Sequence, residues 1–171
     1  MAGAARRPDA PMLIRRAAPG DEAALWAILA PVIRAGDTYV LPRDMGEIEA
    51  LTYWLGQDRE TFVAEADGRI LGTYYLRANQ PGGGAHVANA GYMTAPEARG
   101  RGIASALCAH SLDRARERGF TAMQFNFVVA TNTGAIRLWK RHGFEEVGRL
   151  PGAFIHPTEG PTDALVLFRT L

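Results

Sequence analysis

The sequence is poor in cysteine and in paired metal ligands. Cys108 is the one cysteine in 171 residues, so no disulfide can form within the chain. This fits a reducing compartment, and we expect the cytoplasm. The four histidines, His86, His110, His142 and His156, do not pair at the short spacings that zinc sites use, so we expect no metal site.

Long apolar runs and an excess of charge are also missing. No run approaches the roughly 20 residues of a membrane-spanning helix. The net charge of +1 gives no bulk attraction to nucleic acid or to a membrane surface. Arg6 and Arg7 are not followed by the apolar segment of a signal peptide. We expect a flexible tail over residues 1–11 and one domain over residues 12–171.

Apolar periodicity and turn residues predict strands that alternate with helices. The strands are expected at residues 12–17, 61–66, 70–77, 86–94, 122–129, 145–149 and 164–169, and the helices at 23–35, 45–55, 103–118 and 132–142. Pro31 should kink or end the first helix, Asn132 is placed to cap the last one, and residues 150–162 read as a connection. This order predicts an α/β (α+β) domain with a mixed sheet.

One short segment before a helix has the composition of a phosphate cradle. Glycines let the backbone approach a ligand closely, and the helix start leaves N–H groups unpaired. Arginines add charge that suits a pyrophosphate. The segment consists of Arg99, Gly100, Arg101, Gly102, Ile103 and Ala104.

Two common kinds of nucleotide cradle do not fit this segment. The chain has no Gly-x-x-x-x-Gly-Lys-Ser/Thr string, which excludes a P-loop. A dinucleotide fold needs a third Gly or Ala where Ser105 stands, and an acid about 20 residues on, near Phe120. The dinucleotide interpretation therefore fails at both positions.

The chain resembles the GCN5-related N-acetyltransferases (GNAT) in two motifs. Arg99, Gly102 and Ala104 match the family's Arg/Gln-x-x-Gly-x-Gly/Ala. A second motif, Asn-x-x-Ala-x-x-Leu-Tyr-x-x-x-Gly-Phe, is matched by Asn132, Ala135, Leu138, Trp139, Gly143 and Phe144. The resemblance implies a mixed, mostly antiparallel seven-stranded sheet that splays between strands four and five after a bulge. It also implies about four flanking helices, acetyl-CoA as co-substrate and a homodimer.

The resemblance also implies roles for individual residues. The pyrophosphate would lie on residues 99–104, the pantetheine arm beside Met93 and Thr94, and Asn132 would hydrogen-bond the pantetheine. Trp139 stands where many relatives have tyrosine, and an indole cannot supply a proton to the leaving thiolate. Strand 86–94 lacks the glutamate that many relatives use as base. We expect direct attack by an amine, deprotonated through a water held by asparagine or backbone carbonyls.

Residues 86–92 and 123–129 look like the yeast acetyltransferases that act on azetidine-2-carboxylate and related proline analogues. They place Asn89 and Asn126 on the two splayed strands, where the resemblance gives both a catalytic and a substrate-binding role. The alternative is that these side chains only satisfy backbone groups at the bulge. The resemblance also implies that Thr38 and Tyr39 belong to a lid loop. Tyr39 and Tyr75 either line the acceptor pocket or pack beside it.

The remaining polar candidates are expected to be structural. Cys108 and Trp54 belong on core faces, whereas His110 and His142 should face solvent. The sequence thus predicts an acetyl-CoA-dependent N-acetyltransferase for a small amine, including an amino acid or proline-like analogue, with no nucleic-acid or membrane partner. Two alternatives stay open: acetylation of a protein or peptide, and a coenzyme A-binding regulatory module without chemistry.

Overall fold

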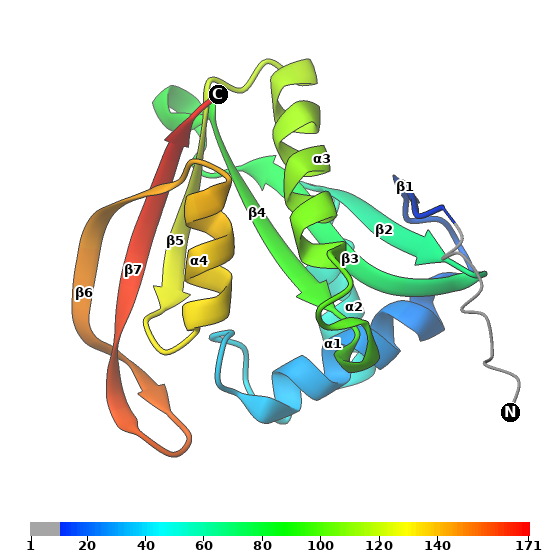
Figure 1. The fold of residues 1–171 in the computed structure, drawn as a ribbon, viewed down its shortest axis with the longest axis horizontal. Helices are drawn as coiled ribbons and strands as arrows, with labels where there is room; N and C mark the ends of the chain where they lie inside the picture. The colour runs from blue at the N-terminus through cyan, green and yellow to red at the C-terminus, as the bar shows by residue number, and fades with distance from the viewer. Residues whose placement is uncertain (1–10) are drawn as a thin grey trace, which may run out of the picture.

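The computed structural model describes residues 11–171, whose strands form one mixed sheet (Figure 1). The strand order is β1-β2-β3-β4-β5-β7-β6, and only the β4–β5 pair is parallel. The strands are β1 (Leu13–Arg16), β2 (Glu60–Ala66), β3 (Arg69–Ala78), β4 (Val87–Thr94), β5 (Ala122–Val129), β6 (Glu145–His156) and β7 (Gly160–Thr170). The seven-stranded, mostly antiparallel sheet that the sequence predicted is confirmed.

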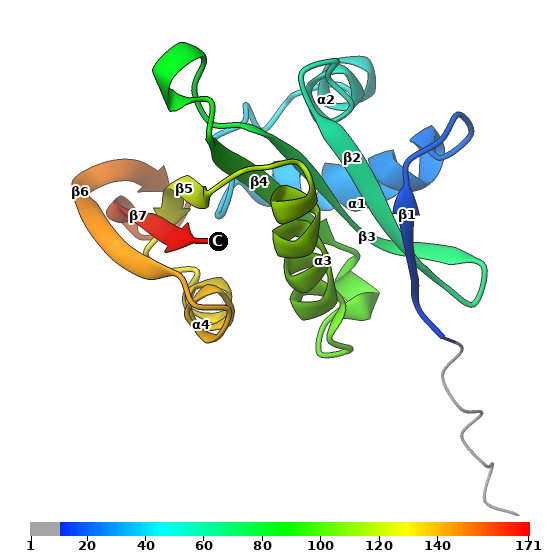
Figure 2. The same ribbon diagram turned by 90° about the horizontal axis from the view of Figure 1, so that it is seen from above.

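Within residues 11–171, four α-helices cover the two faces of the sheet, which confirms the expectation of about four flanking helices. They are α1 (Glu22–Ala35), α2 (Glu47–Trp54), α3 (Ile103–Glu117) and α4 (Thr133–Arg141). Neighbouring residues on β3 show the division, because Tyr75 packs against Trp54 of α2 while Tyr74 hydrogen-bonds His110 of α3. Figure 2 shows α2 on one side of the sheet and α3 and α4 on the other.

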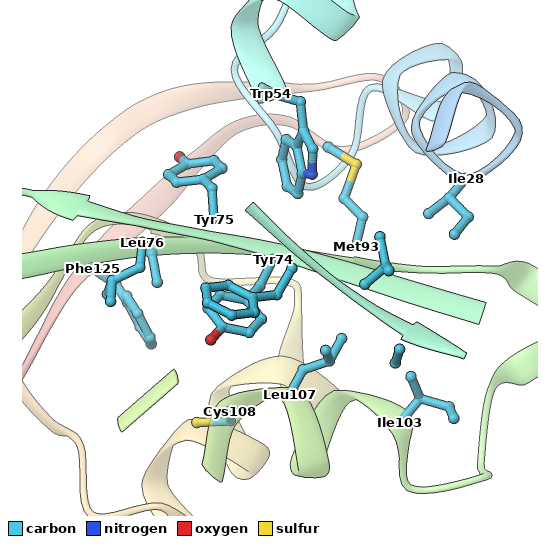
Figure 3. Close-up of a cluster of buried hydrophobic side chains, with 14 of the residues drawn as sticks. Ile28, Trp54, Tyr74, Tyr75, Leu76, Met93, Ile103, Leu107, Cys108 and Phe125 are labelled. Atoms are coloured by element: carbon cyan, nitrogen blue, oxygen red, sulfur yellow. The ribbon is translucent and has the colours of Figure 1, made fainter. Parts of the chain in front are cut away.

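The buried core lies on both sides of strands β3 and β4. Figure 3 shows Trp54 and Tyr75 on one side of these strands and Leu107 and Cys108 on the other. All four side chains are buried, and Trp54, Leu107 and Cys108 are 0% exposed. The predicted core positions of Cys108 and Trp54 are therefore confirmed, and each face of the sheet has its own apolar layer.

The centre of the sheet opens into a fork. β4 and β5 pair only at Val87↔Ala122 and Ala88↔Met123, and then separate. β4 itself is regular, because its register with β3 is unbroken from Gly72↔Thr94 to Ala78↔Ala88. The irregularity lies in β5. Phe125 pairs with Leu167 and Val128 with Leu165, so β5 has one more residue than β7 over this stretch, which forms a bulge. The fork therefore leaves the main chain of β4 without a partner strand on one side.

Two elements differ from the sequence expectations. Of the two outcomes expected at Pro31, an end of the first helix is wrong, because α1 continues to Ala35 with Ile28, Leu29 and Ile33 buried on either side of the proline. Residues 150–162 are not a loose connection, because β6 extends to His156 and β7 starts at Gly160. The prolines of this segment are tolerated because Pro151 lies on the edge strand β6, Pro157 lies between the strands, and Pro161 lies on β7 before its pairing with β5 begins at Ala164.

Two expectations concern features outside the sheet. The flexible tail predicted over residues 1–11 falls, apart from Pro11, outside the described residues. From residue 11 onward, no helix is long and apolar enough to cross a membrane.

Candidate active site

A cavity of about 870 Å³ runs through the fork between β4 and β5. It gathers fourteen of the fifteen residues that the sequence singled out for the site. They are Thr38, Tyr39, Tyr75, Asn89, Met93, Thr94, Arg99, Gly100, Gly102, Ile103, Ala104, Asn126, Asn132 and Trp139. Arg101 is exposed and lies outside the cavity lining. The two ends of this cavity differ in construction.

At one end, the segment before α3 presents unpaired main-chain donors. Gly100 and Gly102 have φ of 75° and 76°, a conformation that costs side-chain-bearing residues free energy. A Cβ on either glycine would meet no protein atom within 4 Å. Among residues 11–171, the N–H groups of Gly102, Ile103 and Ala104 have no acceptor, and the first helical bond runs from Ala106 to the Gly102 carbonyl. The backbone therefore forms an open cradle of donors.

The charge around this cradle favours an anion. Arg99 and Arg141 line the cavity, and the first turn of α3 contains no acidic residue to neutralise the positive end of the helix. Ser105, also in the lining, is hydrogen-bonded to His142 Nε2 at 2.8 Å. This contact ties the start of α3 to the end of α4.

The gap-facing edge of β4 continues the line of main-chain groups. The His86 carbonyl bonds toward β5 and the Val87 carbonyl toward β3. Because these directions alternate along a strand, the N–H and C=O of Tyr92 and Thr94 face the gap, whereas those of Met93 face β3. Met93 contributes its side chain to the cavity wall instead.

The hydroxyl of Tyr39 occupies part of this edge. It donates to the Tyr92 carbonyl at 2.9 Å and accepts from the Tyr92 N–H at 2.8 Å. Burial raises the pKa of Tyr39 well above its usual value, so the hydroxyl is neutral. These two hydrogen bonds thus hold the loop between α1 and α2 against the open edge of β4.

α4 contributes an indole and a free amide to the fork. Trp139 is 8% exposed and packs against Tyr92 and Phe125, with ring centroids at 4.8 and 5.1 Å. It fills the space between the diverging strands and offers no proton. Asn132 stands at the N-cap position, as predicted, but its side chain makes no capping bond. Among residues 11–171 its amide has no hydrogen-bond partner, and it lies in the cavity lining, where a ligand could bind it.

The two asparagines of the fork differ in environment. Asn89 is 8% exposed, and its Nδ2 donates to the Gln124 carbonyl of β5 at 2.9 Å. Asn126 is exposed at the β5 bulge, and it bonds the side chains of Asn79 and Gln124 at 2.6 and 2.8 Å. Asn89 thus satisfies a backbone group, as the structural alternative expected, while both side chains line the cavity.

The far end of the cavity is built from aromatic side chains. Tyr53 and Tyr75 line it, and their hydroxyls lie 3.4 Å apart. Trp54 packs behind Tyr75 with ring centroids at 4.9 Å and donates its indole N–H to Thr73 Oγ1 at 2.9 Å. Burial raises the pKa of Tyr75, so this wall is neutral. Gly91 leaves room for the Tyr75 ring, which a Cβ there would meet at 2.7 Å.

Charged groups at this end were missed at the level of sequence. Arg77 lines the cavity, and Asp58 pairs with both Arg77 and Arg59. Hydrogen bonds from Arg59 hold the pKa of Asp58 below its usual range. Asp37 is the one carboxylate in the lining among the described residues. In the sequence, the position of Asp37 beside Thr38 and Tyr39 could have indicated a site residue. No local sequence pattern connects Arg77 with Asp58.

Three polar side chains of the helices are at least partly buried. His110 and His142 do not simply face solvent, as the sequence had suggested, because each is half-buried and hydrogen-bonded, to Tyr74 and to Ser105 respectively. Burial raises the pKa of the Cys108 thiol to about 12, which removes it as a nucleophile. Within residues 11–171, no cluster of three metal-binding side chains occurs.

The sequence and the fold resemble those of known acetyltransferases. Residues 29–144 match the model of the acetyltransferase (GNAT) family. N-acetyltransferase aca1 of Schizosaccharomyces pombe is 37% identical over 103 residues, which cover 57% of this chain and 47% of that protein. The chain therefore spans about half the length of this curated relative.

Solved structures extend the similarity over nearly the whole chain. A GCN5-related N-acetyltransferase from Kribbella flavida is 40% identical, with 94% of this chain and 98% of that chain covered and a TM-score of 0.90. The yncA protein of Salmonella typhimurium, solved with its cofactor acetyl-CoA, has a TM-score of 0.84 over 95% of each chain. At 20% identity, that second likeness establishes the fold.

Proposed function

The chain belongs to the acetyltransferase (GNAT) family, and on that premise we propose that it is an acetyl-CoA-dependent N-acetyltransferase acting on a small amine. The observation that carries the proposal is the continuity of one cavity. It joins the cradle of main-chain N–H groups at residues 99–104 to the aromatic end through the fork of the sheet. A donor and an acceptor could therefore meet at the open edge of β4.

The cradle fits the pyrophosphate of coenzyme A. Free N–H groups at Gly102, Ile103 and Ala104 would bind its oxygens, and the space beside Gly100 and Gly102 leaves room for close contact. The gap-facing groups of β4 and the Asn132 amide would then bind the pantetheine arm. When bound, acetyl-CoA supplies the thioester that is attacked.

At the fork, the side chains would orient the acceptor for direct transfer. The acceptor amine forms a C–N bond to the acetyl carbon as the C–S bond breaks. A water held by Asn89 and the carbonyls of β4 receives the proton that the amine loses and passes it to solvent. Trp139 would lie between the thioester and the core, and its indole donates no proton. No covalent acyl-enzyme is required, which agrees with the buried and protonated Cys108.

The test is an acceptor panel with acetyl-CoA, monitored by release of free thiol. Small primary and secondary amines, amino acids, and peptides with free N-termini or lysines should be compared at equal concentration. We expect kcat/KM for the best small amine to exceed that of every peptide by at least about tenfold. A peptide as the best acceptor would support protein acetylation instead. Tight acetyl-CoA binding without thiol release from any acceptor would indicate a regulatory module.

We also propose that the protein is a cytoplasmic homodimer. Edge strand β6 supports the dimer, because Val147 and Ile155 are 60% and 69% exposed on it. The single cysteine supports a reducing compartment.

A further inference from the structure

A compact charged cluster lies at the acceptor end of the cavity. Asp58 Oδ1 contacts Arg59 Nε at 2.9 Å, and Asp58 Oδ2 contacts Arg77 Nη1 at 3.1 Å. Two guanidinium groups thus share one carboxylate. The cluster keeps one net positive charge beside the aromatic wall, which favours an anionic group in the cavity.

This cluster contains buried donors without acceptors. Arg59 Nη1 and Arg77 Nε are buried and have no hydrogen-bond partner within the described part of the chain. The Arg59 side chain is 7% exposed and lies over the rings of Tyr53 and Tyr75, at 4.9 and 4.6 Å. Arg59 therefore sits behind the aromatic wall, and Arg77 is the member of the cluster that lines the cavity. Buried donors are normally satisfied, so the unpaired Nε of Arg77, whose side chain lines the cavity, points to an acceptor that a ligand would supply.

The free edge of Arg77 has the geometry that binds a carboxylate. Asp58 uses Nη1, which leaves Nε and Nη2 without a protein acceptor among residues 11–171. The donors Nε–H and Nη2–H run parallel on one edge of a guanidinium and match the two oxygens of a carboxylate. Asp58 also fixes the orientation of the group.

Asn89 provides the complementary acceptor next to Arg77. The two residues are opposite each other in the β3–β4 register, so their Cβ atoms are about 4.5–5.5 Å apart. Because Nδ2 of Asn89 donates to the Gln124 carbonyl, the other end of this amide must be the oxygen. Among the described residues no donor reaches that oxygen, and Asn89 lines the cavity.

We propose that the acceptor carries a carboxylate close to its amine, with Arg77 binding the carboxylate and Asn89 Oδ1 accepting a hydrogen bond from the amine. Because the two residues are direct neighbours on adjacent strands, we expect acceptors whose two groups share one carbon or adjacent carbons. Asn89 holds the nitrogen at the side of β4 where the fork opens. This inference rests on the proposed function and narrows its substrate class.

The first experiment compares each α-amino acid, proline included, with its own carboxamide in the thiol-release assay. The carboxamide keeps the size of the acceptor and removes its charge. The amine of the carboxamide is the weaker base, so a larger fraction of it is unprotonated and reactive. Without a carboxylate site, the carboxamide should therefore be the better acceptor. We expect the best acid to exceed its amide in kcat/KM by about 30-fold. Equal kcat/KM for acid and amide would overturn the proposal.

The second experiment assigns the effect to Arg77. Arg77→Met should lower kcat/KM for the acid by about 30-fold and leave the amide within about threefold. Arg69→Met is the matched control, since Arg69 lies on the same strand, is exposed and pairs with Glu97 outside the cavity. It should leave both acceptors unchanged. An equal loss for acid and amide in Arg77→Met would make Arg77 structural and refute the assignment.

A binding measurement separates this inference from the proposed function. The stabilisation of the coenzyme A-loaded protein by each amino acid is followed as a shift in Tm, in the native chain and in Arg77→Met. We expect a shift in the native chain and none in the variant. Such a shift without thiol release would refute the transferase proposal alone. The absence of any amino-acid shift in the native chain would refute the carboxylate site.

Discussion

The two ends of the cavity recognise ligands by different means. The donor end consists of main-chain N–H groups at Gly102 and its neighbours, arranged by backbone conformation. The acceptor end consists of side chains, among them Tyr75, Arg77 and Asn89, brought together from separate strands. Recognition by main-chain groups tolerates substitutions as long as the backbone angle φ of the cradle residues is kept. At the acceptor end, by contrast, a substitution changes the group that contacts the ligand. The choice of donor is therefore set by the backbone, and the choice of acceptor by side-chain composition.

The strongest test of this contrast is Gly102→Val. A β-branched residue at φ 76° adds strain of about 1–2 kcal/mol, and its side chain would fill the open space in which we expect the pyrophosphate. We expect the Kd for acetyl-CoA to rise by about 100-fold. Isothermal titration calorimetry gives this value directly, and Tm reports the strain.

A matched control separates strain from lost contact. Gly119 has φ 80°, a Cβ there would meet no protein atom within 4 Å, and the residue lies outside the cavity lining. Gly119→Val should lower Tm as Gly102→Val does and leave acetyl-CoA affinity unchanged. If both variants bind acetyl-CoA like the native chain, the cradle assignment is wrong.

The same contrast explains what could be predicted from the sequence. The cradle is local, because Arg99 to Ala104 fix its turn, its donors and its charge within one segment. The individual strands were predictable for a related reason, since each shows its own period, whereas the splay of the sheet followed from the family resemblance. By comparison, the pairing of Asp58 with Arg77 depends on the register of β2 and β3 and on the end of α2. No local pattern in the sequence contains that information.

The second prediction distinguishes the two asparagines within the acceptor end. Asn89 is buried and pairs with a main-chain carbonyl, whereas Asn126 is exposed and pairs with the side chains of Asn79 and Gln124. Asn89→Ala should therefore lower kcat/KM for the acceptor by about tenfold, and Asn126→Ala by less than about threefold. Steady-state kinetics at saturating acetyl-CoA measure both.

The Kd for acetyl-CoA serves as the folding control for these variants. It should stay within about twofold in each, because neither asparagine belongs to the cradle. A larger effect of Asn126→Ala than of Asn89→Ala would reverse our ranking. It would place the catalytic contact at the β5 bulge rather than on β4.

The smallest expected effect concerns the one place where the two ends meet. The Tyr39 hydroxyl pairs with the N–H and C=O of Tyr92, which face the gap that the pantetheine arm would enter. Tyr39→Phe removes that competitor, so the Kd for acetyl-CoA should fall by about threefold. Tyr53→Phe is the control, because the Tyr53 hydroxyl bonds that of Tyr75 across the pocket and its loss should leave the Kd unchanged. Weaker acetyl-CoA binding in Tyr39→Phe would instead show that this hydroxyl contacts acetyl-CoA, and the loop between α1 and α2 would then belong to both ends of the cavity.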